Sequence, residues 1–157
     1  MDDVVAGRPV FSNLHHVGVV VRDIDKAIAH FEALGFGPFQ FDEGVRVFAI
    51  DFDGELHGEP ARWTVKISNG KMGDVDLELL EPGPQPSALR ETLESTGEGM
   101  HHIGFLTDDF EDDVAAMLAQ GAKIWTMSKR DDAPSFLFFE AAEVGGTAIE
   151  LRTAGPG

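Results

Sequence analysis

The chain has 157 residues and a formal net charge of −16 at pH 7, from 12 basic and 28 acidic residues. This acidity argues against a nucleic-acid partner and against binding to an anionic membrane surface, because both require concentrated Lys and Arg. The sequence has no cysteine, which excludes disulfides, thiolate catalysis and cysteine-based zinc sites. Any metal site must therefore use nitrogen and oxygen ligands.

The N-terminal segment, MDDVVAGRPV, is acidic where a secretory signal would be basic, and no apolar run approaches the roughly 18 residues of a membrane span. We therefore expect a cytoplasmic protein without a membrane partner. The length predicts one structural domain overall, preceded by a loose lead-in over residues 1–12.

One stretch of the chain occurs twice. Residues 14–36 read LHHVGVVVRDIDKAIAHFEALGF, and residues 100–124 read MHHIGFLTDDFEDDVAAMLAQGAKI. An ungapped offset of 86 residues aligns His16 with His102 and Gly18 with Gly104. Matches at one fixed offset indicate two copies of a supersecondary unit, each with a histidine-bearing strand followed by a helix.

The first module is predicted over residues 13–81. Its valine-rich segment 16–21 favours a strand, and apolar residues at helical spacing predict a helix over 24–34 after an N-cap at Asp23. Three more strands are predicted at 45–52, 63–67 and 75–80. Gly and Pro predict a turn or mobile loop over residues 53–60, and Asn69-Gly70 predicts the turn between the last two strands.

The second module is predicted over residues 100–157, after a proline-rich linker at 82–99 with a short helix capped by Ser87. Its strand at 102–107 and helix at 108–120 repeat the first module. Strands at 123–127, 136–139 and 147–151 complete it. Both modules therefore have the order strand, helix and three strands.

Each module has one helix to cover one face of its sheet, so the other face is open unless the two modules cover each other. We predict an α+β fold in which paired βαβββ modules form a cupped mixed sheet around a cavity. His16 and His102 take equivalent places in it, and the last strands add Glu78 and Glu150. Two imidazoles and two carboxylates are suitable ligands for divalent Zn, Co, Ni, Mn or Fe.

A lone strand histidine is ordinarily a surface or core residue, so the metal prediction depends on the repeat. Side chains alternate between the faces of a strand, and only one histidine of each pair can face the cavity. We choose His16 and His102 because each begins an H-x-G motif. His15 and His101 then face outward or serve as outer-shell groups.

The segments LHHVGVVVRDIDKAIAHFEALGF, LELLEP, GEGMHHIGF and GGTAIELR together resemble the vicinal oxygen chelate superfamily. This superfamily includes glyoxalase I, extradiol dioxygenases, bleomycin-resistance proteins and methylmalonyl-CoA epimerase, and the chain is most similar to the epimerases. The resemblance covers about residues 13–152. It implies paired βαβββ modules with a divalent metal held by His16, Glu78, His102 and Glu150, and relatives of this kind are often homodimers.

The resemblance to the epimerases implies an isomerase that abstracts a proton next to a carbonyl, with a metal-stabilised enolate and a small-molecule substrate such as an acyl-CoA thioester. Epimerases similar to this chain carry a catalytic Glu on the second strand, and DEGV at 42–45 resembles that segment, so Glu43 is a candidate base. An exposed acid in a turn is the alternative interpretation. Glu150 is the other candidate base; it would be a metal ligand that leaves the metal and takes the proton. A patch for coenzyme A phosphates is predicted from Arg46, Arg62, Lys66, Lys129 and Arg130.

Other activities of the superfamily remain open from the sequence. A glyoxalase I-like lactoylglutathione lyase would use the same proton-transfer logic. An extradiol-type dioxygenase needs two histidines, one carboxylate and three open positions on iron, which a fourth protein ligand argues against. A non-enzymatic small-molecule-binding (resistance) protein would not need the four ligands.

Overall fold

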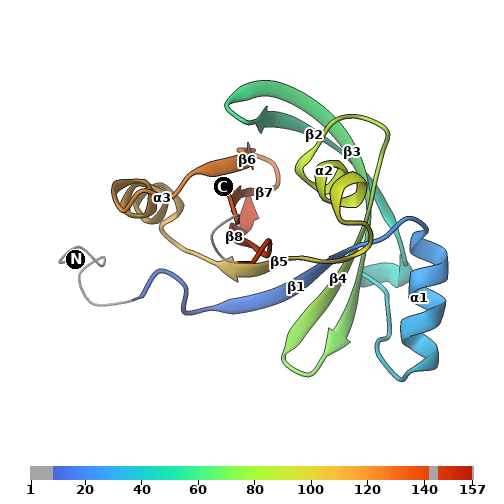
Figure 1. Cartoon of the computed structure of the whole chain (residues 1–157). Coiled ribbons are helices and arrows are strands. Elements are labelled where there is room, and N and C mark those ends of the chain that lie inside the picture. The colour runs from blue at the N-terminus through green and yellow to red at the C-terminus, as the bar shows by residue number, and fades with distance from the viewer. Residues whose placement is uncertain (1–8, 142–144, 157) are drawn as a thin grey trace.

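The computed structural model describes residues 9–141 and 145–156, so most of the predicted lead-in lies outside the described residues. Within this part of the chain, eight strands form a closed barrel in the order β1-β4-β3-β2-β6-β7-β8-β5 (Figure 1). The strands are β1 Leu14–Val20, β2 Phe48–Leu56, β3 Glu59–Met72, β4 Val75–Pro82, β5 Gly99–Leu106, β6 Ile124–Ser128, β7 Pro134–Phe139 and β8 Ala148–Pro156. The helices are α1 Ile24–Ala33, α2 Ala88–Ser95, α3 Phe110–Ala119 and a 3-10 turn, η1 Asp42–Gly44.

The predicted α+β fold and its two βαβββ modules are confirmed. The first module contains β1, α1, β2, β3 and β4, and the second contains β5, α3, β6, β7 and β8. The predicted linker helix is α2, where the Ser87 hydroxyl accepts a hydrogen bond from the Arg90 amide at 3.0 Å.

The modules join through their first strands. β1 runs antiparallel to β5, and in each module the first strand also runs parallel to the last strand, β1 with β4 and β5 with β8. A short antiparallel contact between β2 and β6 closes the other side of the barrel. His16 faces Gly104 across the β1–β5 pair, and Gly18 faces His102. This symmetric register is what the repeat in the sequence produces.

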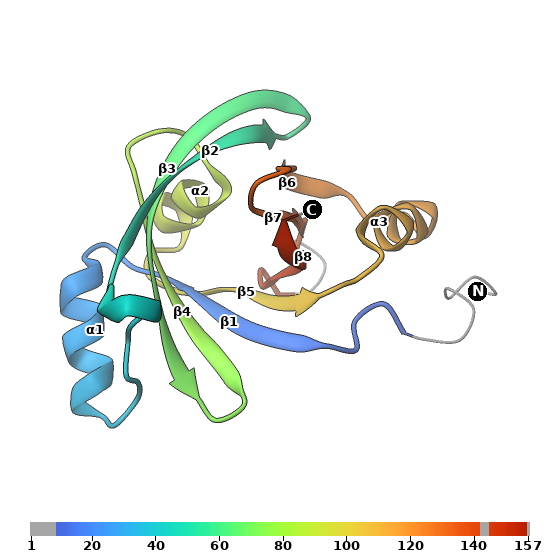
Figure 2. The same ribbon diagram turned by 180° about the vertical axis from the view of Figure 1, so that it is seen from behind.

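Helices α1 and α3 cover the outside of the barrel on opposite sides (Figures 1 and 2). Ile24 and Ile28 of α1 pack with Leu77 and Leu79 of β4 in one apolar cluster. A second cluster joins α3 to β7 and β8, and a third joins α2 to the barrel strands around Trp63. Because Leu77 and Leu79 face α1, strand alternation turns Glu78 inward.

The turn predicted over residues 53–60 is present, but the longer loop is not. β2 continues to Leu56 and β3 begins at Glu59, so the turn consists of His57 and Gly58, which both have positive φ angles of 52° and 80°. In β2, Phe52 and Leu56 pack against the apolar cluster that joins α2 to the barrel, while the intervening acids are exposed. This alternation outweighs the Gly and Pro residues, because inward packing and ladder hydrogen bonds stabilise the hairpin.

The predicted turn at Asn69-Gly70 is also wrong, because β3 continues through it to Met72 and pairs with β4. A Cβ atom on Gly70 would lie 2.6 Å from the ring of Phe39, so this glycine allows a buried aromatic ring to approach the strand. Gly73, with a φ of 69°, provides the turn instead.

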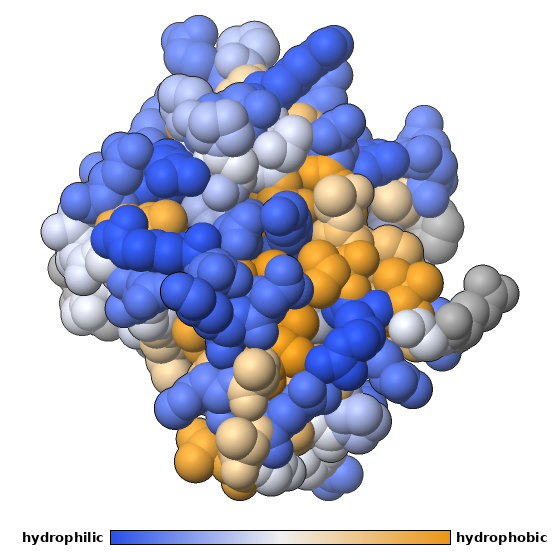
Figure 3. Space-filling model, turned by 90° about the vertical axis from the view of Figure 1, so that its right-hand side faces the viewer, coloured by the Kyte–Doolittle hydropathy of each residue, from blue (hydrophilic) through white to orange (hydrophobic). Residues whose placement is uncertain are grey.

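Polar residues cover most of the face shown in Figure 3, which also has a hydrophobic patch to the right of its centre. The large apolar side chains that remain exposed among the described residues come from several elements: Leu14, Leu34, Phe48, Met100 and Leu118. None of the described helices is both long enough and apolar enough to span a membrane.

The contact between α1 and β4 yields a stability prediction. Leu79 is 0 % exposed, so Leu79→Ala should leave a cavity and lower the free energy of unfolding by about 2–5 kcal/mol. Leu34→Ala is the matched control, because Leu34 is 63 % exposed and its truncation should change stability by less than about 0.5 kcal/mol. Urea denaturation measures both values, and equal losses would contradict this account of the core.

Candidate metal centre

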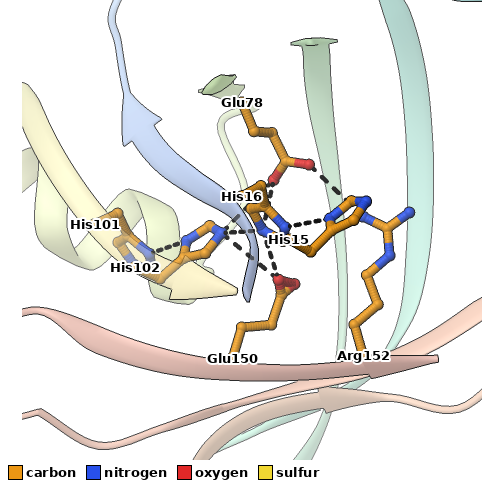
Figure 4. A network of polar contacts seen from close by, with 7 residues as sticks. All are labelled: His15, His16, Glu78, His101, His102, Glu150 and Arg152. Atoms are coloured by element: carbon orange, nitrogen blue, oxygen red, sulfur yellow. Dashed lines mark hydrogen bonds and ion pairs between the residues drawn. The ribbon is translucent and has the colours of Figure 1, made fainter. Parts of the chain in front are cut away.

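The four predicted ligands meet inside the barrel (Figure 4). The Nε2 atoms of His16 and His102 lie 3.0 Å apart. Glu150 Oε2 lies 2.9 Å from His16 Nε2, and Glu78 Oε1 lies 3.7 Å from it. His102 Nε2 lies 3.6 Å from Glu78 Oε1 and 3.7 Å from Glu150 Oε2. Each of the four residues is at most 5 % exposed, so the structure brings all of them into one buried site.

The H-x-G motif explains how the imidazoles reach this position. A Cβ atom built on Gly104 would lie 2.1 Å from the His16 ring, and one built on Gly18 would lie 2.2 Å from the His102 ring. Each glycine therefore leaves room for the imidazole of the other module. Because the β1–β5 register is symmetric, a single sequence feature positions both rings.

The carboxylates are positioned by the same two glycines. Glu78 on β4 pairs with Gly18 on β1, and Glu150 on β8 pairs with Gly104 on β5. Figure 4 shows Glu78 and Glu150 approaching the imidazoles from opposite sides. Each module thus contributes one imidazole and one carboxylate.

The neighbouring histidines do not face away from the site. His15 Nδ1 lies 2.8 Å from His16 Nδ1, and His101 Nδ1 lies 2.9 Å from His102 Nδ1. His101 is buried and stacks on Trp125 with a centroid distance of 5.2 Å. If His16 and His102 donate from Nδ1, each keeps an Nε2 lone pair directed at the centre, so His15 and His101 orient the ligands from the outer shell.

Charge in the site is balanced by protonation. Burial disfavours a charged His16, but the negative charges of Glu78 and Glu150 outweigh burial and raise the pKa of His16 to about 9. Burial also opposes a charged Glu78, yet the positive charge of His16 holds the pKa of Glu78 below the usual range. Burial lowers the pKa of His101 to about 3, so this ring is neutral at pH 7.

Comparisons with known proteins identify the family. The family profile described as "Glyoxalase/Bleomycin resistance protein/Dioxygenase superfamily" matches residues 15–138. The chain belongs to this superfamily. It is 27 % identical to the uncharacterized protein YqjC of Bacillus subtilis (strain 168) over 143 residues, 89 % of this chain and 91 % of the relative.

Solved structures support the same fold. A variant of Streptomyces coelicolor methylmalonyl-CoA epimerase in complex with 2-nitronate-propionyl-CoA is 24 % identical, with a TM-score of 0.63 over 91 % of this chain and 97 % of that one. Methylmalonyl-CoA epimerase from Mycobacterium tuberculosis is 20 % identical, with a TM-score of 0.64 over 94 % and 91 % of the two chains. Similarity at this level shows the superfamily fold.

The residues of this superfamily member fit a divalent cation. His16, Glu78 and His102 form a buried group whose ligand atoms all lie within 4.8 Å of one another. Glu150 Oε2 is buried and lies 2.9 Å from His16 Nε2, which can donate a hydrogen bond to it only when that nitrogen is protonated. Two buried carboxylates are costly unless positive charge lies beside them, and a bound cation would supply that charge.

The candidate base Glu43 lies in η1, five residues before β2 begins at Phe48. It is therefore not on the second strand, where the epimerase-like pattern would place it. The short turn lies beside α1 (Figure 2), and its first residue, Asp42, lines a surface hollow with the preceding Phe41 and with Phe48. The role of Glu43 as a base stays a prediction.

The sequence analysis missed Arg152, which lines the same cavity as Glu78 and Glu150. Its Nη1 atom lies 3.8 Å from Glu78 Oε2. The signal was present in the sequence, because Arg152 follows Glu150 by two residues in a strand and therefore shares its face.

The predicted cationic patch is already paired. Arg46, Arg62, Lys66, Lys129 and Arg130 each form an ion pair with an acid, respectively Glu32, Asp53, Glu81, Glu111 and Asp132. A coenzyme A phosphate would have to compete with these carboxylates for every one of the five side chains.

The close approach of Gly104 to His16 leads to a prediction. Gly104→Ala should displace the His16 ring and weaken cobalt(II) binding at least about 100-fold, because a misplaced ligand loses most of its bond to the metal. Gly155→Ala is the control, since a Cβ atom there meets nothing within 4 Å. Competition with a chelator measures the affinity, and circular dichroism checks folding. A folded Gly104→Ala protein with wild-type affinity would contradict the geometry.

The raised pKa of His16 predicts a pH dependence. Below about pH 9 the imidazole carries a proton that a bound cation must displace. The apparent affinity for cobalt(II) should therefore rise by about tenfold per pH unit from pH 6.5 and level off above about pH 9. Calorimetry in buffers of different ionisation enthalpy should detect release of about one proton per ion at pH 7.5. A flat affinity between pH 7 and 9 is the contrary result.

Proposed function

We propose that the protein is a divalent-metal-dependent isomerase that moves a proton on carbon next to a carbonyl group, as an epimerase does. The convergence of two imidazoles and two carboxylates at the wall of an apolar cavity carries this proposal. The similarity to methylmalonyl-CoA epimerase structures supports the same reaction class.

His16, Glu78, His102 and Glu150 would hold the cation, with His15 and His101 fixing the orientation of the two rings. A bound divalent cation supplies Lewis acidity, which makes the proton next to a carbonyl more acidic. Co, Zn, Ni, Mn and Fe all suit the nitrogen and oxygen ligand set.

Two carboxylates are candidates for the base. Glu150 is already in the site, where its Oε2 atom lies 2.9 Å from His16 Nε2, and it would take a proton from the substrate after leaving the cation. Glu43 is the second candidate, and only the resemblance to the epimerases supports it. Returning the proton to the opposite face of the carbon would require a second acid, which would give both carboxylates a role.

The cavity favours this chemistry by excluding water. Phe52, Trp63, Phe136 and Phe138 line it together with aliphatic side chains, and α2 contributes Ala88 and Leu89. In such surroundings, charges on the carboxylates and on the reacting carbonyl interact more strongly than in water.

The proposed substrate is a small carbonyl compound, with an acyl-CoA thioester as one candidate. The acyl-CoA ligand of the epimerase structure supports this candidate. The ion pairs that occupy the five predicted phosphate-binding residues weigh against it. We also propose a homodimer, for which exposed Leu14 on β1 and Met100 on the adjoining β5 are candidate contact residues.

Proton exchange tests the function. Incubation of acyl thioesters and other carbonyl compounds with the cobalt-loaded protein in deuterated buffer should replace the proton next to the carbonyl, as NMR detects. His102→Ala should lose cobalt and exchange together. Glu43→Gln should keep its cobalt and lose exchange about 100-fold or more if Glu43 is the base, whereas Glu150→Gln should lose exchange if Glu150 is.

His101→Ala is the control for the ligand assignment, since it should keep most of its cobalt at saturating metal. Full occupancy in both His101→Ala and His102→Ala would show that the wrong histidine was assigned as the ligand. An absence of exchange with every compound, in a protein that holds its cobalt, would exclude the proposed isomerase.

A further inference from the structure

Arg152 lies next to the candidate metal centre. It follows Glu150 on β8, and strand alternation turns both side chains into the barrel. Figure 4 shows its guanidinium beside Glu78, on the side of the centre away from His102. The superfamily ligand set does not use this side chain, so its position needs another explanation.

The guanidinium has donors without acceptors. Its Nε atom is buried and makes no hydrogen bond within residues 9–141 and 145–156. Its ion pair with Glu78, at 3.8 Å between Nη1 and Oε2, is too long for a hydrogen bond. Arginine keeps its charge in proteins, so an unpaired buried donor of this kind is costly until an acceptor arrives.

Glu78 cannot serve as the full partner of Arg152. Its Oε1 atom faces the two imidazoles at 3.7 Å and 3.6 Å, and only Oε2 faces the guanidinium. One carboxylate group therefore separates the metal centre from Arg152. A ligand that reaches both must combine an oxygen donor for the centre with an anionic group for Arg152.

The contrast with Arg130 shows that this arrangement is specific to Arg152. Arg130 lines the same cavity, but its Nε and Nη2 atoms already donate to Asp132 at 3.1 Å and 3.2 Å. The exposed Arg62 likewise pairs with Asp53. In a chain with a net charge of −16, a guanidinium with unused donors points to an anionic ligand.

The remaining cavity defines the other end of that ligand. Its volume is about 140 Å³, and its aromatic wall contains Phe52, Trp63, Phe136 and Phe138. A cavity of roughly 150 Å³ lined by apolar side chains can accommodate benzene. The space beside the centre therefore suits an apolar group of about the size of a phenyl ring.

We propose that Arg152 binds a carboxylate of the substrate, and that the substrate is a small carbonyl compound that also carries a phenyl-sized apolar substituent. This substrate assignment rests on the proposed function, because it places the carbonyl oxygen at the metal centre. The guanidinium donates hydrogen bonds to the carboxylate, the aromatic wall holds the substituent, and the carbon next to the carbonyl group lies beside Glu150.

Calorimetric titration with benzylmalonate, which has two carboxylates on one carbon and a phenyl group, tests the assignment. Arg152→Gln in the cobalt-loaded protein should weaken binding by about 10–100-fold, because charged hydrogen bonds are lost. Arg152→Lys should weaken binding at least about fivefold, because lysine lacks the fork of donors, and it decides the question if Arg152→Gln does not fold. Arg62→Gln removes the same charge at the surface and should change nothing.

The controls separate this inference from the proposed function. Cobalt content, measured for each variant, must match the wild type, and dimethyl benzylmalonate, which is neutral, should show no effect of Arg152. If the chain takes up no cobalt, the same titration on the metal-free protein still compares the wild type with the Arg152→Gln variant. Failure of the wild type to bind benzylmalonate, or affinities of Arg152→Gln within twofold of wild type, would overturn the assignment. If benzylmalonate binds but the protein catalyses no proton exchange, only the proposed isomerase activity is overturned.

Discussion

The approach of each imidazole to the glycine of the opposite module is the contact on which the candidate metal centre depends. His16 lies over Gly104 and His102 over Gly18, with no room for a side chain at either glycine. The same glycines pair with the strands that carry Glu78 and Glu150. The strand pairing that joins the two modules therefore also positions the metal ligands. A change in the β1–β5 register would separate the two imidazoles and the two carboxylates.

Buried charge is the second constraint. Two carboxylates that lie within 4 Å of two imidazoles are expensive in the interior of a protein, and the raised pKa of His16 shows how strongly this site attracts positive charge. A proton provides part of that charge. A divalent cation provides more of it and can bind both carboxylates and both imidazoles, so the residues fit a metal site.

The barrel around the centre is asymmetric although the ligand set is symmetric. α2 occupies one side of the interior, and the long β2–β3 hairpin provides Phe52 and Trp63 for the cavity wall. Arg152 adds a cation on the Glu78 side of the centre. Since the ligand set is symmetric, the proposed preference for an anionic ligand with an apolar group rests on these asymmetric features.

Much of the architecture could be read from the sequence, because periodicity and the fixed offset of the repeat are local or internally repeated signals. They predicted the two βαβββ modules, the capped helix α2 and the residues His16, Glu78, His102 and Glu150 that the structure brings together. They mispredicted the β2–β3 hairpin, where Gly and Pro suggested a loop and cross-strand packing made strands. Tertiary structure alone decided that Gly70 accommodates Phe39, that Arg152 stands beside Glu78 and that the predicted phosphate-binding cations are paired. These outcomes depend on which residues meet across the barrel, and a linear pattern carries no information on distances between strands that are far apart in the chain.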